Sequence, residues 1–222
     1  MTLYEKNKKI LSKNYSYNEN MEHDACGVGM IATTNGKKSR KIVDYGIEAL
    51  KAIWHRGAVD ADGKSGDGAG IQIEIAPEFF KDKITSTGQT LDEKKRICVG
   101  MVFLPRTNYT DQEKCREIIE SVLIEENYHI YGWRQVPVNS NVLGATAERS
   151  RPEIAQVMFK KNEILKTNDL ERDLFETRKK IEKLARENQL KNFYICSFSS
   201  RSIVYKGMFL AEMLAEFYPD LY

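Results

Sequence analysis

The order of apolar and polar residues changes its period along this chain, and each period predicts one kind of element. Short apolar or alternating runs, which are typical of strands, lie at residues 26–33, 71–75, 97–104, 128–138, 154–159, 193–198 and 202–205. Patterns typical of helices lie at residues 42–54, 115–122, 169–187 and 209–217. The chain is therefore predicted to form short strands with helices inserted between them.

Polar residues and glycines at the ends of these runs predict where the helices begin and end. Ser39 precedes the first helical pattern and is a suitable N-cap, and Gly57 follows that pattern in the position of a C-cap. Thr110 and Glu113 have the spacing of a capping box, so we expect the second helix to open there. Asp169 is the expected cap of the long charged helix.

The order of the elements indicates a fold class. Strands come in pairs and helices lie between the pairs, which favours antiparallel sheets layered with helices over a doubly wound parallel sheet. The runs at 193–198 and 202–205 predict the two arms of a hairpin. The predicted class is α+β.

Composition and charge exclude several kinds of protein. The chain has 222 residues, of which 41% are hydrophobic and 30% charged, as in an ordinary soluble protein of one or two domains. Its net charge is +2 and its charges are interleaved, so no nucleic-acid partner is indicated. No apolar run approaches the roughly 18 residues of a membrane span, so we expect no membrane partner and a cytoplasmic location.

The four cysteines are Cys26, Cys98, Cys115 and Cys196. They form no CxxC pair, which argues against a local metal or iron–sulfur site, and no secretory signal precedes them, which argues against disulfides. We therefore expect no metal ligands here and interpret three of the four as small core residues.

Cys26 has the most informative surroundings. It lies between Ala25 and Gly27, after a polar segment, residues 1–25, that we expect to be a loosely ordered leader. Cleavage after Ala25 makes Cys26 the N-terminal residue, whose own amine, with a pKa of about 7.7–8.0, is then available as the base that activates the thiol. The alternative is a small buried residue at the start of a strand.

Two further features have both a structural and a functional interpretation. Arg56 is either a cation at the end of a helix or an arginine near Cys26 that positions the nucleophile or neutralises a carboxylate. The run Gly66-Asp67-Gly68-Ala69-Gly70 has neither the GxGxxG nor the GK[ST] spacing and precedes a strand, which argues against nucleotide binding. It is either the wall of a tight pocket or a cluster of turns.

Taken together, several motifs resemble the beginning of the large subunit of glutamate synthase. They are His23-Asp24-Ala25-Cys26-Gly27-Val28-Gly29, His55-Arg56-Gly57-Ala58, Gly66-Asp67-Gly68-Ala69-Gly70-Ile71 and the segments at 100–105, 132–137 and 199–208. The resemblance runs from about residue 20 to the end of the chain.

This resemblance implies a class II glutamine amidotransferase domain, residues 26–222, preceded by a propeptide, residues 1–25. The implied fold is the four-layer αββα sandwich of N-terminal-nucleophile hydrolases, incomplete at its C-terminus. The implied catalytic residue is Cys26, which attacks L-glutamine to give glutamate and ammonia, and the implied substrate-binding residues are Arg56 and Gly27.

The resemblance also implies parts that this chain does not contain. In the parent enzyme of glutamate biosynthesis, downstream synthase domains use the ammonia to aminate 2-oxoglutarate reductively, with FMN, an iron–sulfur cluster, and ferredoxin or a small NAD(P)H-oxidising subunit. No cofactor is expected in this chain. The carboxylate-binding segment and the oxyanion Asn-Gly pair are also expected after Tyr222, so we do not expect residues 1–222 alone to be a competent glutaminase. Two alternatives remain, the glutaminase domain of a phosphosugar-linked amidotransferase and a truncated non-catalytic module.

Overall fold

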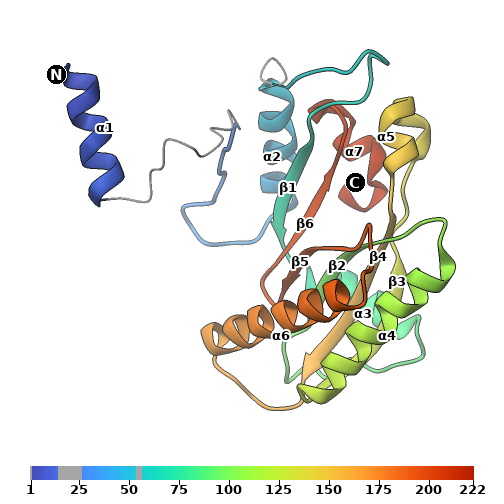
Figure 1. Ribbon diagram of the computed structural model, residues 1–222. Helices are drawn as coiled ribbons and strands as arrows, with labels where there is room; N and C mark the ends of the chain where they lie inside the picture. The colour runs from blue at the N-terminus through green and yellow to red at the C-terminus, as the bar shows by residue number, and fades with distance from the viewer. Residues whose placement is uncertain (1, 15–26, 54–56) are drawn as a thin grey trace.

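The computed structural model describes residues 2–14, 27–53 and 57–222 (Figure 1). The α-helices are α1 (Leu3–Asn14), α2 (Arg40–Ala52), α3 (Pro77–Thr85), α4 (Tyr109–Glu125), α5 (Ala145–Ser150), α6 (Thr167–Glu187) and α7 (Leu214–Phe217). The strands are β1 (Ala69–Glu74), β2 (Cys98–Leu104), β3 (Tyr128–Gln135), β4 (Glu153–Lys161), β5 (Tyr194–Ser199) and β6 (Ser202–Gly207).

The strands form two antiparallel sheets. The larger has the order β3-β4-β2-β5, and the smaller pairs β1 with β6. Central strand β2 is buried along nearly its whole length, as its continuous apolar run requires. The α+β class with antiparallel sheets that the sequence predicts is confirmed.

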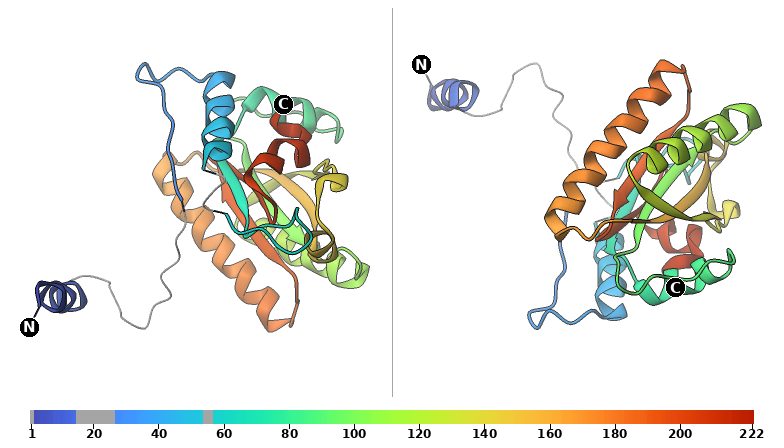
Figure 2. Two further views of the ribbon diagram at one scale, coloured as in Figure 1. Left: turned by 90° about the horizontal axis from the view of Figure 1, so that it is seen from above. Right: turned by 90° about the horizontal axis from the view of Figure 1, so that it is seen from below.

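Helices α4 and α6 lie side by side over one face of the larger sheet (Figure 2). The space between the two helices and the sheet is filled by buried apolar side chains from both. Examples are Val102 and Phe159 of the sheet and Ile119, Leu174 and Ile181 of the helices. The buried stripe of α6 is apolar except for Thr177, whose hydroxyl donates to Asp173 O within the helix, and the charged residues of its other side make the helix amphipathic.

The other face of the larger sheet belongs to a second cluster. This cluster joins the sheet to β6, α2, α3 and α7, through residues that include Met101, Met158, Ile47, Phe80 and Tyr205. Helix α2 packs directly on the smaller sheet, where the Cβ position of Gly46 lies 3.0 Å from Ile71 Cδ1. The core therefore has helices on one side of the larger sheet and the smaller sheet with its helices on the other.

The predicted N-cap is confirmed for one helix, and two other helices begin earlier than predicted. Ser39 is the N-cap of α2 and accepts a hydrogen bond from Lys41 N at 3.3 Å. Helix α4 begins one residue before Thr110, because the side chain of Asn108 accepts from Asp111 N and is the N-cap. Helix α6 begins before Asp169, with Lys166 at the N-cap position and no side-chain cap.

The predicted strand at 26–33 is wrong for residues 27–33, which belong to no helix or strand. Val28 and Met30 are 94% and 91% exposed. A strand needs a partner edge to satisfy its backbone groups, and no strand of the described residues pairs with this segment. Gly27 and Gly29 weaken strand formation further.

Two other expectations are corrected. Helix α2 ends at Ala52 with Ile53 as its C-cap, so Gly57 does not cap it. The runs at 193–198 and 202–205 do form consecutive strands, but β5 pairs with β2 and β6 pairs with β1, so the two strands divide between the sheets. The apolar run at 209–217 forms a 3-10 turn followed by the short helix α7.

Three helices have no counterpart in the predictions. Helix α1 lies within residues 1–25, the segment that was expected to be loosely ordered, and none of its residues is buried. Helix α3 begins at Pro77, in the first-turn position that proline favours, and α5 spans only six residues. Within the described part of the chain, no helix is both long and apolar enough to cross a membrane.

Candidate functional site

Of the three predicted site residues, the structure describes Gly27. It is exposed and opens the extended segment that runs to Thr33. Cys26 and Arg56 lie outside the described residues. The parts of the candidate site with a defined geometry are therefore the loop that follows Arg56, residues 57–68, and the elements that this loop contacts.

The first half of this loop folds back on the second half. Ala58 N donates to Asp67 Oδ2 at 3.1 Å, and Asp67 N donates to Ala58 O at 3.3 Å. Val59 and Gly66 form an isolated antiparallel bridge. The glycine- and aspartate-rich stretch is thus a small closed loop whose two ends are tied together beside β1.

Asp62 lies at the tip of the loop and joins it to α5, more than eighty residues away in sequence. Asp62 Oδ2 accepts from Thr146 N at 3.0 Å and from Ser65 Oγ at 2.6 Å. Asp62 Oδ1 accepts from Ser65 N at 2.7 Å and from Lys64 N at 3.0 Å. One carboxylate therefore closes the turn and also accepts from one backbone N–H in the first turn of α5, that of Thr146.

Ser65 completes this connection. Its side chain is buried, with 2% exposure, and its Oγ accepts from Ala147 N at 3.0 Å. The backbone N–H groups of Thr146 and Ala147 belong to the first turn of α5, where a helix provides no internal partner. We call the group formed by Asp62, Ser65, Thr146 and Ala147 the loop–helix lock.

Gly144 leaves room for the Asp62 carboxylate of the lock, and Gly66 is close to the segment at Phe209 and Leu210. A Cβ at Gly144 would lie 2.3 Å from Asp62 Oδ2, a distance no side chain tolerates. A Cβ at Gly66 would lie 3.1–3.2 Å from Leu210 and the backbone of Phe209. Other chain segments approach the backbone closely at both positions, and most closely at Gly144. The close contacts of Gly66 support the interpretation of the glycine-rich run as tight packing.

The electrostatics of Asp62 favour its charged form. Hydrogen bonds from the Ser65 hydroxyl, the Ser65 and Lys64 N–H groups and Thr146 N hold the pKa of Asp62 far below its ordinary value. The carboxylate therefore stays ionised throughout the range in which proteins are ordinarily folded. An anion at the start of α5 also complements the helix dipole.

The other three cysteines are core residues, as predicted. Cys98, Cys115 and Cys196 are buried with free thiols. Burial raises the pKa of Cys115 to about 11 and that of Cys196 to about 11, and it raises the pKa of Cys98 further. Their thiols stay protonated at neutral pH, which makes them poor nucleophiles.

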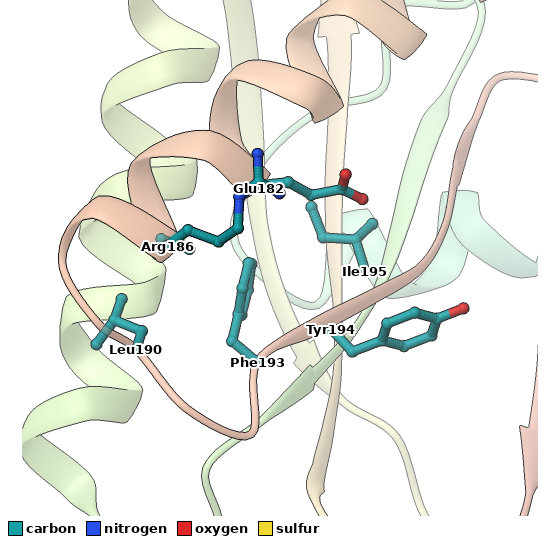
Figure 3. A pocket seen from close by; sticks show the side chains of 7 residues that line it. Glu182, Arg186, Leu190, Phe193, Tyr194 and Ile195 are labelled. Atoms are coloured by element: carbon teal, nitrogen blue, oxygen red, sulfur yellow. The ribbon is translucent and has the colours of Figure 1, made fainter.

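A surface pocket lies elsewhere, between the C-terminal half of α6 and the start of β5 (Figure 3). One acidic and one basic side chain line it together with apolar and aromatic ones. The lining residues are Glu182, Ala185, Arg186, Leu190, Phe193, Tyr194 and Ile195. None of these residues belongs to the loop or to α5. Among the described residues there is also no group of three or more His, Cys, Asp or Glu side chains placed to hold a metal ion.

The sequence of this chain is similar to those of known proteins. The sequence model of the family described as "Glutamine amidotransferases class-II" matches residues 26–222. The chain is 51% identical over 215 residues to the glutamate synthase [NADPH] large chain of Azospirillum brasilense, a match that covers 97% of this chain and 14% of that protein.

Ferredoxin-dependent relatives are similar over nearly the same region. The ferredoxin-dependent glutamate synthase of Pyropia yezoensis is 43% identical over 204 residues, covering 90% of this chain and 13% of that protein. Ferredoxin-dependent glutamate synthase 2 of Synechocystis sp. is 41% identical over 200 residues, covering 90% and 12%. The chain thus spans only 12–14% of the length of these relatives. The family that the motifs predicted is confirmed.

Sequence reasoning missed the loop–helix lock. Asp62-Gly63 is a turn signal, and Ser65 three residues after Asp62 is a spacing at which a side chain can close a turn. These local signals predict the turn. They contain nothing about Thr146 and Gly144, because that contact depends on how β1 and α5 are brought together in the fold.

Proposed function

The chain belongs to the class II glutamine amidotransferase family, and on this premise we propose that, as part of a longer protein, it supplies the nucleophile that hydrolyses L-glutamine to glutamate and ammonia. The observation that carries the proposal is that the family match begins at Cys26, the residue between the polar leader and the glycines. The similarity to glutamate synthase large chains favours a glutaminase of that kind over a phosphosugar-linked amidotransferase.

The chemistry assigned to Cys26 begins with removal of residues 1–25. The freed α-amine accepts the thiol proton, and the sulfur attacks the carboxamide carbon of glutamine. The C–N bond breaks and ammonia leaves with a proton. Water then hydrolyses the glutamyl thioester to release glutamate. Arg56 and Gly27 are assigned to binding of the substrate, Arg56 by pairing with its carboxylate.

The wider role is also a proposal. In the full-length protein, downstream synthase domains with FMN and an iron–sulfur cluster consume the ammonia by reductive amination of 2-oxoglutarate. The reductant is supplied by ferredoxin or by an NAD(P)H-oxidising subunit, and the enzyme works in the cytoplasm. The residues of this chain take no part in the redox step and need no cofactor of their own.

The test compares two cysteine variants of the full-length protein that contains this sequence. Intact mass should show that Met1–Ala25 has been removed, and Cys26→Ala should abolish release of glutamate and ammonia from glutamine. Cys115→Ala is the matched control, because the thiol of Cys115 is buried in α4. This variant should leave hydrolysis unchanged.

Labelling gives an independent measurement. A diazoketone analogue of glutamine should modify Cys26 and spare the three buried thiols, as peptide mapping can show. Active protein that retains the leader would contradict the N-terminal-nucleophile mechanism. Full activity of Cys26→Ala would contradict the assignment of the nucleophile.

A further inference from the structure

We propose that the pocket between α6 and β5 binds a small carboxylic acid with an aromatic or branched apolar body, and that Arg186 pairs with its carboxylate. The site is separate from the proposed glutaminase chemistry, since none of its lining residues is Cys26, Gly27 or Arg56. The cavity volume is about 340 Å³, which is enough for a small organic ligand.

Apolar side chains make up most of the pocket lining. Ala185 and Ile195 are buried, with 3% and 1% exposure, and they are the part of the lining that belongs to the core. Leu190 and Phe193 are half-buried and pack against the same core. Burial of apolar surface against these four side chains is favourable, so the body of the ligand should be apolar.

The backbone holds this lining in place before a ligand binds. The chain leaves α6 through a Schellman motif, in which Leu190 N donates to Ala185 O at 3.0 Å and Gln189 N donates to Arg186 O at 2.9 Å. Gln189 and Asn192 have φ angles of 56° and 60°, a left-handed conformation that usually belongs to glycine. Such backbone outliers are frequent at ligand sites, and here they fix Leu190 beside Ala185.

Arg186 brings a positive charge to this apolar lining. It lies in the last turn of α6, and its exposed side chain has no hydrogen bond or ion pair with any residue that the structure describes. In Figure 3 the ring of Phe193 points toward the side chain of Arg186. A carboxylate on an apolar body that packs against Phe193 can therefore pair with the guanidinium, which binds carboxylates through two parallel hydrogen bonds.

The acidic lining residue, Glu182, does not cancel the charge of the arginine. Its Oε1 accepts from Arg178 Nε at 2.7 Å and its Oε2 accepts from Lys179 Nζ at 2.8 Å, so two cations already neutralise it. Near the start of β5, Lys206 Nζ donates to the Tyr194 hydroxyl at 2.8 Å and adds a further positive charge. The charges around the pocket therefore favour an anion and disfavour an ammonium group on the ligand.

The experiment measures binding of 3-phenylpropionate to the full-length protein that contains this sequence, by ligand-observed NMR titration. The probe should bind with a Kd of about 1 mM, as expected for a ligand of its size. 3-Phenylpropanol lacks the carboxylate, acetate lacks the apolar body and phenylalanine adds an ammonium group. Each of the three should bind at least about tenfold more weakly than the probe, because each loses or opposes one of the two contacts.

Variants place the probe in this pocket. Arg186→Leu should raise the Kd for 3-phenylpropionate at least about tenfold, and Arg186→Lys should give an intermediate value, because an ammonium keeps the charge without the planar pair of donors. Lys183→Leu is the matched control. It removes a cation of the same helix whose side chain is 70% exposed and which lies outside the pocket lining, so the Kd should change by less than about twofold.

The outcomes are independent of glutamine hydrolysis, so failure of this inference and failure of the proposed function are separate results. The inference is overturned if the full-length protein does not bind 3-phenylpropionate, or if it binds 3-phenylpropanol equally well. It is also overturned if Arg186→Leu leaves the Kd unchanged, or if Lys183→Leu raises it as much, because the effect would then follow the charge of the helix. The comparison of probes uses the unchanged protein and decides the question even if Arg186→Leu does not fold.

Discussion

The two faces of the larger sheet contact their neighbours through different chemistry. The face toward α4 and α6 is filled by apolar side chains such as Val102, Phe159 and Leu174, all fully buried. Its ionised groups lie at the edge, where Asp173 is 29% exposed and pairs with Lys161. The opposite face, by contrast, carries a polar network in its interior.

That network joins both sheets to the C-terminal segment. Arg134 Nη1 and Nη2 donate to the two carboxylate oxygens of Asp220 at 2.7 and 2.6 Å, and Nη1 also donates to Gln156 Oε1 at 2.9 Å. Gln156 Nε2 donates to the Tyr205 hydroxyl, which donates to Asp220 Oδ2, both at 3.3 Å. Burial raises the pKa of Tyr205, so its hydroxyl stays protonated and keeps donating.

The difference concerns what each face tolerates. An apolar contact loses energy in proportion to the atoms and volume removed. A buried charged network loses far more when one partner goes than when all go, because the remaining charge has neither partner nor water. The polar face therefore stays stable only while every partner of the network is present. On the apolar face, the loss of stability follows the volume of the side chain that is removed.

Asp220→Ala should produce the largest loss of stability, about 3–5 kcal/mol. The change leaves the Arg134 guanidinium buried, since its side chain is only 13% exposed, and Gln156 then remains as its hydrogen-bond acceptor in the network. Urea unfolding gives the free energy. The double variant Arg134→Met with Asp220→Leu should lose less than the single variant, and an equal or larger loss in the double variant would contradict this account.

Leu174→Ala should cost about 2–5 kcal/mol, through lost burial and the cavity left behind. Leu174 is fully buried on the sheet-facing side of α6. Its neighbour Phe175 is 57% exposed, so Phe175→Ala is the matched control and should change stability by less than about 0.5 kcal/mol. Similar losses of stability in the two variants would contradict the burial of Leu174 and the exposure of Phe175, and with them the orientation of α6 on the sheet.

The elements that the sequence predicted well are those whose signal is local. Strand β2 is a continuous apolar run, and the Ser39 cap acts over two residues. The apolar segment at 27–33 has the same kind of composition as β2, yet it forms no strand among the described residues. Composition makes a segment able to pair, but a strand also requires an open edge beside it.

The long-range polar contacts of the loop–helix lock and of the Arg134–Asp220 network were beyond sequence reasoning for a related reason. Asp62 and Thr146 are 84 residues apart, and Arg134 and Asp220 are 86 apart. A hydrogen bond between such residues leaves no periodicity in the sequence. The motif around Cys26 was recognisable because its residues are consecutive, whereas the loop–helix lock joins residues far apart in sequence and is assembled only by the fold.

Alkali should weaken both faces, since each contains a buried thiol. The pKa of Cys115, on the apolar face, and that of Cys196, on the other, are raised from 9.0 to about 11. Their stabilising contribution is complete below pH 9 and is lost as pH rises toward 11, because the unfolded chain ionises first. The loss is at most about 2.7 kcal/mol per thiol, from 1.36 kcal/mol for each pKa unit.

Urea midpoints at pH 8, 9 and 10 under reducing conditions measure this dependence. Cys115→Ala and Cys196→Ala should each flatten the decline relative to the unchanged protein, although both variants start from a lower stability. If the urea midpoint of both variants falls with pH as steeply as that of the unchanged protein, other groups, such as the buried tyrosines, account for the dependence.

The smallest expected effect sharpens the description of the apolar face at the start of α4. Asn108 Oδ1 accepts from Asp111 N at 3.1 Å and Asn108 Nδ2 donates to Asp111 Oδ2 at 2.7 Å, so Asn108→Ala should cost about 1 kcal/mol in urea unfolding. Thr110 lies inside the helix and is exposed, so Thr110→Ala should change stability by less than about 0.5 kcal/mol. The reverse order of the two losses would restore the capping box of Thr110 and Glu113 and place the helix start where the sequence pattern alone predicted it.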